Sequence, residues 1–295
     1  MKKGFIKSVI LSLLFICSAS MYAQQAPEVP IDPKVRYGKL DNGLTYYIRA
    51  NKLPKERAEF FIAQNVGAIL ENDDQNGLAH FLEHMCFNGT KNYPDKGIIN
   101  YFESIGVKFG SNINAYTAQD ETVYNLSDVP TTRDGIIDSA LLVLHDWSSF
   151  ITLDGKEIDA ERGVIREEWR QGASPERRML KESSKQKYPG SQYAKRDVIG
   201  DTAIINNFTH QTIRDYYKKW YRPDLQAILI VGDVDVDKVE AKIKALFADI
   251  PKKENAGERP VYPILDNAEP IVSIVKDKEA RMTQIELEYK HDVLP

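Results

Sequence analysis

Two of the five histidines in this chain of 295 residues lie four positions apart, with a glutamate between them. The stretch reads His80-Phe81-Leu82-Glu83-His84. Because successive helical residues are rotated by about 100°, a helix brings both imidazoles and the Glu83 carboxylate onto one face. Two imidazoles at this spacing can bind one zinc ion, and the carboxylate can take a proton from an attacking water. The spacing predicts a hydrolytic zinc site with Glu83 as the base.

A catalytic zinc ion needs a third protein ligand. None of the other three histidines lies in a suitable context, so a carboxylate is expected. The predicted helix 154–171 carries Glu161 and Glu168 along one edge of its inward face, whereas Glu167 points to nearly the opposite side. The inward face is marked by four residues, namely Ile158, Ile165, Trp169 and Gly172. Glu161 and Glu168 are therefore the candidates.

Carboxylates that border an apolar stripe are costly to bury unless they pair with a cation. We expect Glu168 to be the third zinc ligand. Glu161, two turns earlier, is expected to be a catalytic-site carboxylate that assists coordination. A structural ion pair with Arg162 or Arg166 is the alternative, in which case neither carboxylate would bind a metal.

The elements predicted to position these residues are short strands between longer helices. Alternating side chains on both sides of Asn42-Gly43 predict a β-hairpin over residues 35–49. Further strands are expected at 58–66, 107–116, 121–126 and 226–232. Helices are expected at 77–88, 96–105, 131–150, 154–171, 174–187, 209–220 and 236–247. The histidine motif and the candidate third ligand therefore lie on two different helices.

The first 23 residues have the features of a secretory signal peptide. Three lysines precede the apolar run 9–17, and small residues follow up to Ala23, near which we expect cleavage. The run has about half the length that a membrane-spanning helix needs, so no membrane anchor is expected. The protein is predicted to be exported, either to the periplasm or out of the cell.

The charge of the exported chain argues against nucleic acid as a partner. Without the three lysines of the signal peptide, the 39 basic side chains fall to 36 against 43 acidic ones, which gives a net charge of −7. No basic stripe or patch is evident in the sequence. Cys86 is then the only cysteine, which excludes an internal disulfide.

The C-terminal part of the sequence indicates a second domain. Residues 251–270 contain four prolines and are typical of a linker after a first domain of residues 24–250. Two strands are expected beyond the linker, at 271–276 and 282–290. Because a lone hairpin is marginal in water, residues 271–295 are expected to be the start of an incomplete second domain.

These motifs resemble those of the inverted-zincin metallopeptidases, the group of pitrilysin, insulin-degrading enzyme and the mitochondrial processing peptidases. The resemblance is carried by residues 80–84 and by the segment ERGVIREE at 161–168. In this family the third zinc ligand follows an earlier helical glutamate by seven residues, which implies the pair Glu161 and Glu168. The resemblance implies an α+β fold with a largely antiparallel sheet packed with helices, followed by the start of a second similar domain.

A further resemblance concerns residues 114–117 and 121–124, which are similar to the edge strand of the family and its partner strand. In the family, an extended substrate peptide pairs with this edge strand through backbone hydrogen bonds. The resemblance implies that Asn114 and Ala115 bind substrate. A plain surface hairpin is the alternative.

The implied function is that of an exported zinc-dependent endopeptidase that hydrolyses peptides or unstructured polypeptide segments. Family members enclose peptides between two halves. The resemblance therefore implies a peptide substrate and a second half, which belongs to the same longer chain or to a separate subunit. Two alternatives stay open: a non-catalytic member that acts as a binding or assembly partner, and a truncated member without activity.

Overall fold

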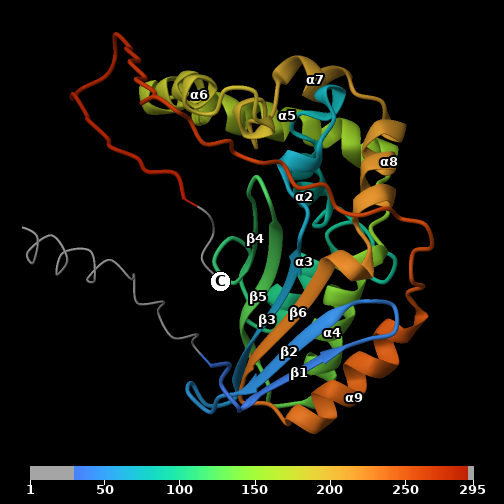
Figure 1. Cartoon of the computed structure of the whole chain (residues 1–295). Coiled ribbons are helices and arrows are strands. Elements are labelled where there is room, and N and C mark those ends of the chain that lie inside the picture. The colour runs from blue at the N-terminus through green and yellow to red at the C-terminus, as the bar shows by residue number, and fades with distance from the viewer. Residues whose placement is uncertain (1–29, 292–295) are drawn as a thin grey trace, which may run out of the picture. The chain divides into compact units, whose positions relative to one another are not determined.

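The computed structural model describes residues 30–291. One compact unit, Pro33–Tyr289, contains all the helices and strands described (Figure 1). The described residues outside this unit, 30–32 and 290–291, form neither helix nor strand. The predicted signal peptide, residues 1–23, lies outside the described part of the chain.

Six strands form one sheet in the order β1-β2-β6-β3-β5-β4. Their bounds are Val35–Lys39 (β1), Thr45–Ala50 (β2), Arg57–Gln64 (β3), Ile113–Thr117 (β4), Thr122–Pro130 (β5) and Gln226–Gly232 (β6). All neighbouring strands are antiparallel except β2 and β6, which are parallel. The expected α+β fold with a largely antiparallel sheet is confirmed. Strand β4 lies at the edge of the sheet.

One face of the sheet is buried beneath helices. Every second residue of β3, beginning at Ala58, is buried, as expected for a strand with one face toward a core. Helix α4 (Asp134–Ser149) packs against β3 and β5, and α9 (Val236–Leu246) packs against β2 and α4. Phe60 of β3 and Trp147 of α4 are fully buried in the core between sheet and helices.

A second group of helices surrounds α2 (Leu78–Met85) near strand β4 (Figure 1). The remaining helices are α3 (Gly97–Ser104), α5 (Gly155–Gln171), α6 (Pro175–Lys187), α7 (Thr202–Asn207) and α8 (His210–Trp220). Helix α2 packs against β4, α5 and α8, and α5 packs against α7. Short 3-10 helices lie at Ala68–Leu70, Asp73–Gln75, Gln192–Ala194, Pro223–Leu225 and Phe247–Asp249. Between residues 30 and 291, no helix is long and apolar enough to cross a bilayer.

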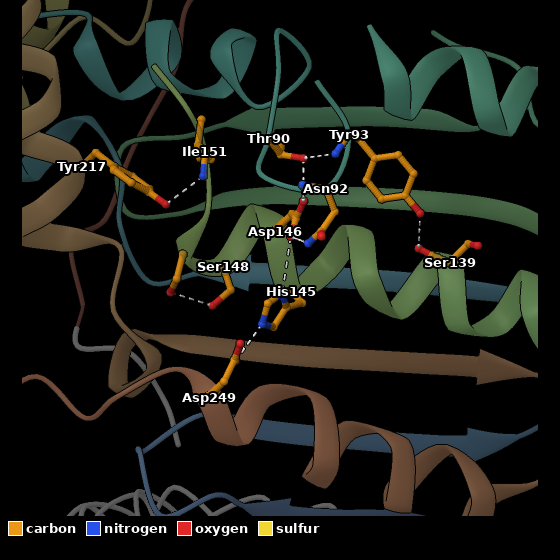
Figure 2. A network of polar contacts seen from close by, with 11 residues as sticks. Thr90, Asn92, Tyr93, Ser139, His145, Asp146, Ser148, Ile151, Tyr217 and Asp249 are labelled. Carbon is orange, nitrogen blue, oxygen red and sulfur yellow. Dashed lines mark hydrogen bonds and ion pairs between the residues drawn. The ribbon is translucent and has the colours of Figure 1, made fainter. Parts of the chain in front are cut away.

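A buried polar network ties α4 to the loop that follows α2 (Figure 2). The fully buried carboxylate of Asp146 accepts hydrogen bonds from the Thr90 hydroxyl (2.6 Å) and from the backbone and side-chain N–H groups of Asn92 (2.8 and 2.7 Å). Beside it, Nε2 of His145 contacts Oδ1 of Asp249 at 2.8 Å. The network holds the loop after α2 against the core and so fixes the C-terminal end of that helix.

The strands expected at 271–276 and 282–290 are not formed. The described residues 251–291 contain neither helix nor strand. Apolar side chains of this segment are exposed, for example Ile285 at 92%. Ion pairs hold part of the segment to α6, including that of Arg178 with Asp277 at 2.7 Å. A hairpin with no further strands and no packed face gains too little from burial to form, which accounts for the difference.

Candidate metal centre

Helix α2 carries the histidine motif, and close contacts fix its first turn. A Cβ atom at Gly77, where φ is 105°, would lie 2.7 Å from Cα of Gly200, so only glycine fits. The buried carboxylate of Glu71 accepts hydrogen bonds from the N–H groups of Gly77 (3.0 Å) and Ala79 (2.8 Å). Burial raises the pKa of Glu71 to about 8, although these two hydrogen bonds oppose the shift. The contacts anchor the N-terminal amides of α2 and hence the direction of the motif.

The two histidines of α2 converge on one carboxylate of α5. Nε2 of His80 lies 3.6 Å from Oε1 of Glu168, and Nε2 of His84 lies 3.3 Å from Oε2 of the same side chain. One ligand atom from each of the three residues can be chosen so that all lie within 4.8 Å of one another. Residues 84 positions apart in the sequence thus lie close together in the fold.

The donor set at this point fits zinc. Two imidazole nitrogens and one carboxylate oxygen are the three protein ligands of many catalytic zinc sites, which keep a fourth position open. His80 is buried, whereas the side chain of Glu168 is 48% exposed, so the cluster opens to solvent on the side of α5. Nδ1 of His80 is buried and has no hydrogen-bond partner among the described residues. The chemistry and the spacing are those of a site that could hold zinc.

Glu161 lies behind His84, on the side away from Glu168. Nδ1 of His84 donates a hydrogen bond to Oε1 of Glu161 at 2.8 Å, and the side-chain amide of Asn88 donates to Oε2 at 2.7 Å. The ammonium of Lys96 in turn donates to Oδ1 of Asn88. Because Nδ1 bonds to Glu161, Nε2 is the ring nitrogen that faces the point of convergence. Asn88 and Lys96 were not expected from the sequence, because their contacts arise only in the fold.

Arg162, one of the two arginines predicted as alternative partners, does not pair with these carboxylates. Arg162 contacts Asp159 at 3.1 Å and donates to the carbonyl oxygen of Phe208 at 2.8 Å, away from Glu161. Glu167 forms an ion pair with Arg170 at 2.6 Å and stays remote from the histidines. The structure therefore separates Glu167 from Glu161 and Glu168 as the helical periodicity predicts.

The two imidazoles differ in their affinity for protons. Burial lowers the pKa of His80 to about 4, and the positive charge of His84 acts in the same direction. Burial alone would lower the pKa of His84 as well, but hydrogen bonds to Glu161 and Glu168 raise it to about 9. The carboxylates around His84 therefore favour a positive charge beside the point where the three ligand atoms converge.

Glu83 lies on the same face of α2 and is buried. Oε2 of its carboxylate accepts a hydrogen bond from the hydroxyl of Thr117, the last residue of β4. Burial raises the pKa of Glu83, and the Thr117 hydroxyl partly offsets this shift. A carboxylate with a raised pKa is better matched to proton transfer near neutral pH than an exposed one. Thr117 belongs to a segment singled out by resemblance, but its contact with Glu83 was not foreseen.

The edge strand β4 runs beside α2. Hydrogen bonds from Ala118 N–H to the Glu121 carbonyl (2.8 Å) and from Ser127 N–H to the Asn112 carbonyl (2.8 Å) set the alternation of this ladder. By that alternation, Asn114 faces β5, whereas the N–H and C=O groups of Ala115 face the free edge. The Ala115 N–H is covered by the Oδ1 atom of Asn114 at 2.9 Å. The N–H group of Ala115, on the strand that packs against α2, is thus directed away from β5.

The inward face of α5 is shorter than the periodicity suggested. Ile158 and Ile165 are its buried residues, but Trp169 is 38% exposed and Gly172 lies at the C-terminal cap. The expectation that Trp169 faces the core is wrong. A helical wheel treats all turns alike, whereas burial differs along α5, whose buried residues Ile158 and Ile165 both lie before its last turn. Glu168 is half-exposed for the same reason.

Comparison with known proteins places the chain in a family. Residues 47–196, just over half of the chain, match the family described as Insulinase (Peptidase family M16). The chain belongs to peptidase family M16. A second match of this M16 chain, to the Peptidase M16 inactive domain, spans residues 207–290.

The relatives of this M16 protein include zinc proteases. It is 40% identical to the probable zinc protease PqqL of Haemophilus influenzae over 83% of its own length and 26% of that relative. It is 36% identical to the Escherichia coli protein of the same name over 90% of its length and 28% of that relative. The crystal structure of the first half of the periplasmic protease PqqL from Escherichia coli superimposes with a TM-score of 0.76 at 36% identity, over 81% of this chain and 51% of that one. The chain thus spans about a quarter of the length of these relatives.

Proposed function

We propose that this chain forms the zinc-binding catalytic domain of an exported metalloendopeptidase that hydrolyses peptides or unstructured polypeptide segments. The observation that carries the proposal is the convergence of His80, His84 and Glu168, with Glu83 on the same helical face. The relatives described as zinc proteases support the metal and the reaction class. We expect the three residues to hold one zinc ion.

Each residue of the cluster has a defined task in this proposal. When bound, zinc supplies Lewis acidity toward the scissile carbonyl and makes an attacking water more acidic. Glu83 accepts the proton of that water and passes it to the leaving amine. Glu161 accepts a hydrogen bond from Nδ1 of His84, with 2.8 Å between Oε1 and Nδ1, so that Nε2 is the nitrogen that would bind a metal ion.

The edge strand β4 indicates which class of substrate the enzyme would bind. A peptide that adds to β4 as a further strand would pair with the outward N–H and C=O groups of Ala115. Asn114 lies at the same place, and its side chain would leave the Ala115 N–H when a substrate carbonyl replaces it. Only an extended segment can pair in this way, which favours unstructured substrates over folded ones.

The sequence and the relatives support a location and a partner for the proposed enzyme. The predicted signal peptide at residues 1–23 and the periplasmic PqqL of Escherichia coli support a periplasmic enzyme. The matched PqqL structure is a first half, so we propose that a second half, in the same longer polypeptide or in another, closes the site around the peptide. In this view residues 271–295 begin the next domain, and its remaining strands complete the pairing that the segment lacks.

The test is the variant Glu83→Gln, which keeps size and hydrogen bonding but cannot accept a proton. We expect it to retain zinc and to lose at least a hundredfold in turnover of an internally quenched, unstructured peptide. A chelator should abolish the wild-type activity, and added zinc should restore it. Glu167→Gln, on the outer side of α5, is the matched control and should keep full activity. Unchanged turnover in Glu83→Gln would refute the proposal and favour a binding or assembly role.

A further inference from the structure

Thr117 joins the edge strand to the candidate base. Its hydroxyl donates a hydrogen bond to Oε2 of Glu83 across 34 positions of sequence. Since Oε2 already accepts this hydrogen bond, Oε1 is the carboxylate oxygen that has no such contact among the described residues and can accept a hydrogen bond from a water or a substrate. Threonine is branched at Cβ, so the direction of its hydroxyl is set closely by the backbone of the strand that carries it.

The backbone of Thr117 faces the free edge of the sheet. Thr117 lies opposite Thr122 in the β4–β5 register, and the hydrogen-bonded neighbour is Ala118, whose N–H donates to the Glu121 carbonyl at 2.8 Å. The alternation of an antiparallel ladder then directs the N–H and C=O groups of Thr117 outward, as it does for Ala115. Thr117 thus presents its backbone to an added strand and its side chain to Glu83.

The chain on the far side of Thr117 is locked. The carbonyl oxygen of Ala118 accepts a hydrogen bond from the N–H of Ala68 at 3.2 Å, and that of Gln119 accepts one from the N–H of Ile69 at 2.8 Å. At Gly67, a Cβ atom would lie 2.4 Å from the carbonyl oxygen of Gln119, so the two segments approach as closely as glycine allows. The position of the Thr117 hydroxyl is therefore fixed by β5 on one side and by residues 67–69 on the other.

We propose that Thr117 is a positioning residue that aims the Glu83 carboxylate relative to the peptide-pairing edge of β4. In this proposal β4 pairs with the substrate backbone and also fixes the position of the Glu83 carboxylate. Peptide pairing and proton transfer therefore depend on the same rigid strand. The proposal rests on the peptidase function proposed above. It adds to that function the residue that couples peptide binding to the base.

The experiment compares three variants of the full-length product of the gene. Thr117→Val removes the hydroxyl but keeps the shape and strand preference, and Thr117→Ser keeps the hydroxyl. Thr45→Val on β2 makes the same chemical change at a half-buried strand position that three strands separate from β4. Zinc content, kcat, KM for an unstructured peptide and the crystallographic position of the Glu83 side chain are measured for each.

We expect Thr117→Val to bind zinc normally, to lower kcat by about tenfold with little change in KM, and to show a displaced or multiply placed Glu83 carboxylate. Thr117→Ser should restore most of kcat, and Thr45→Val should match the wild type. The inference is overturned if Thr117→Val keeps the wild-type kcat and carboxylate position, if it loses zinc, or if only KM rises. If the proposed peptidase function itself is wrong, Glu83→Gln will be as active as the wild type. That result is therefore distinguishable from a failure of the Thr117 inference.

Discussion

At the scale of single residues, the cluster assigns different tasks to two carboxylates of one helix. Glu168 lies near Nε2 of both histidines, whereas Glu161 accepts a hydrogen bond from Nδ1 of His84. The two glutamates are two helical turns apart, and the His84 ring lies between them. An imidazole held on both sides in this way has one orientation, with Nδ1 toward Glu161 and Nε2 toward Glu168.

We expect metal binding to depend on the carboxylate of Glu168. Replacement by Gln in Glu168→Gln removes the charge and the strong oxygen ligand, so we expect zinc affinity to fall by at least about a hundredfold. Competition with a chromophoric chelator measures the affinity. Glu167→Gln, one position earlier and paired with Arg170, should leave it unchanged. The reverse pattern would show that α5 presents the other glutamate to the metal.

At the scale of elements, β4 is an edge strand that is only partly protected. Edge strands expose unpaired backbone groups that invite pairing with other chains. Here the strand is short, and the side chain of Asn114 covers the outward N–H of Ala115. Tyr116 is tied to Glu121 by a hydrogen bond of 2.8 Å. The edge is thus protected at Ala115 by a side chain and not by a further strand, which is compatible with the peptide pairing that we propose.

Proline at position 115 tests the use of this edge. Ala115→Pro removes a backbone N–H that points away from β5, so the ladder loses no hydrogen bond and the fold should persist. We expect KM for an unstructured peptide to rise about five- to tenfold, the effect of one lost hydrogen bond, with kcat little changed. Asn114→Pro removes an N–H that pairs with β5 and should instead lower the thermal stability. Equal effects of the two variants on stability would contradict the alternation assigned to β4.

At the scale of the whole compact unit, the network around Asp146 connects three parts of the chain. It joins α4 to the loop after α2 and, through His145 and Asp249, to the 3-10 helix Phe247–Asp249 that follows α9. Burial by itself would lower the pKa of His145, but hydrogen bonds to Asp146 and Asp249 raise it above its ordinary value. The charged imidazole therefore stabilises the fold at pH values below about 6.5, and this stabilisation is lost as the pH rises through the raised pKa.

His145→Gln should reveal this dependence. At pH 6 we expect the variant to have a free energy of unfolding about 2 kcal/mol below that of the wild type, the usual cost of losing a hydrogen bond between charged groups. The difference should be smaller at pH 9, because the wild-type imidazole loses its charge as the pH rises through its raised pKa. Urea unfolding at a series of pH values measures it. The His145 ring also stacks on Phe150, with 4.5 Å between the ring centroids. A difference that is the same at both pH values would mean that this packing, not the charge, stabilises the region.

The sequence by itself determined what depends on local geometry. The spacing of His80, Glu83 and His84 places them on one helical face wherever the helix lies, because the rotation per residue is fixed. The same rule singled out Glu161 and Glu168 and set Glu167 apart. The hairpin at Asn42-Gly43 is also local, since its turn residues alone favour the pairing of β1 and β2.

Only the tertiary structure decided what depends on contacts between distant segments. The parallel pairing of β2 with β6 joins Thr45 to Ala227, and no local pattern encodes that register. Thr117 and Asn88 reach the site because β4 and the end of α2 pack beside it. The exposed last turn of α5 and the absence of strands in the described segment 271–290 were missed for the same physical reason. Periodicity records which side of an element is apolar, but burial depends on whether another element is there to cover it.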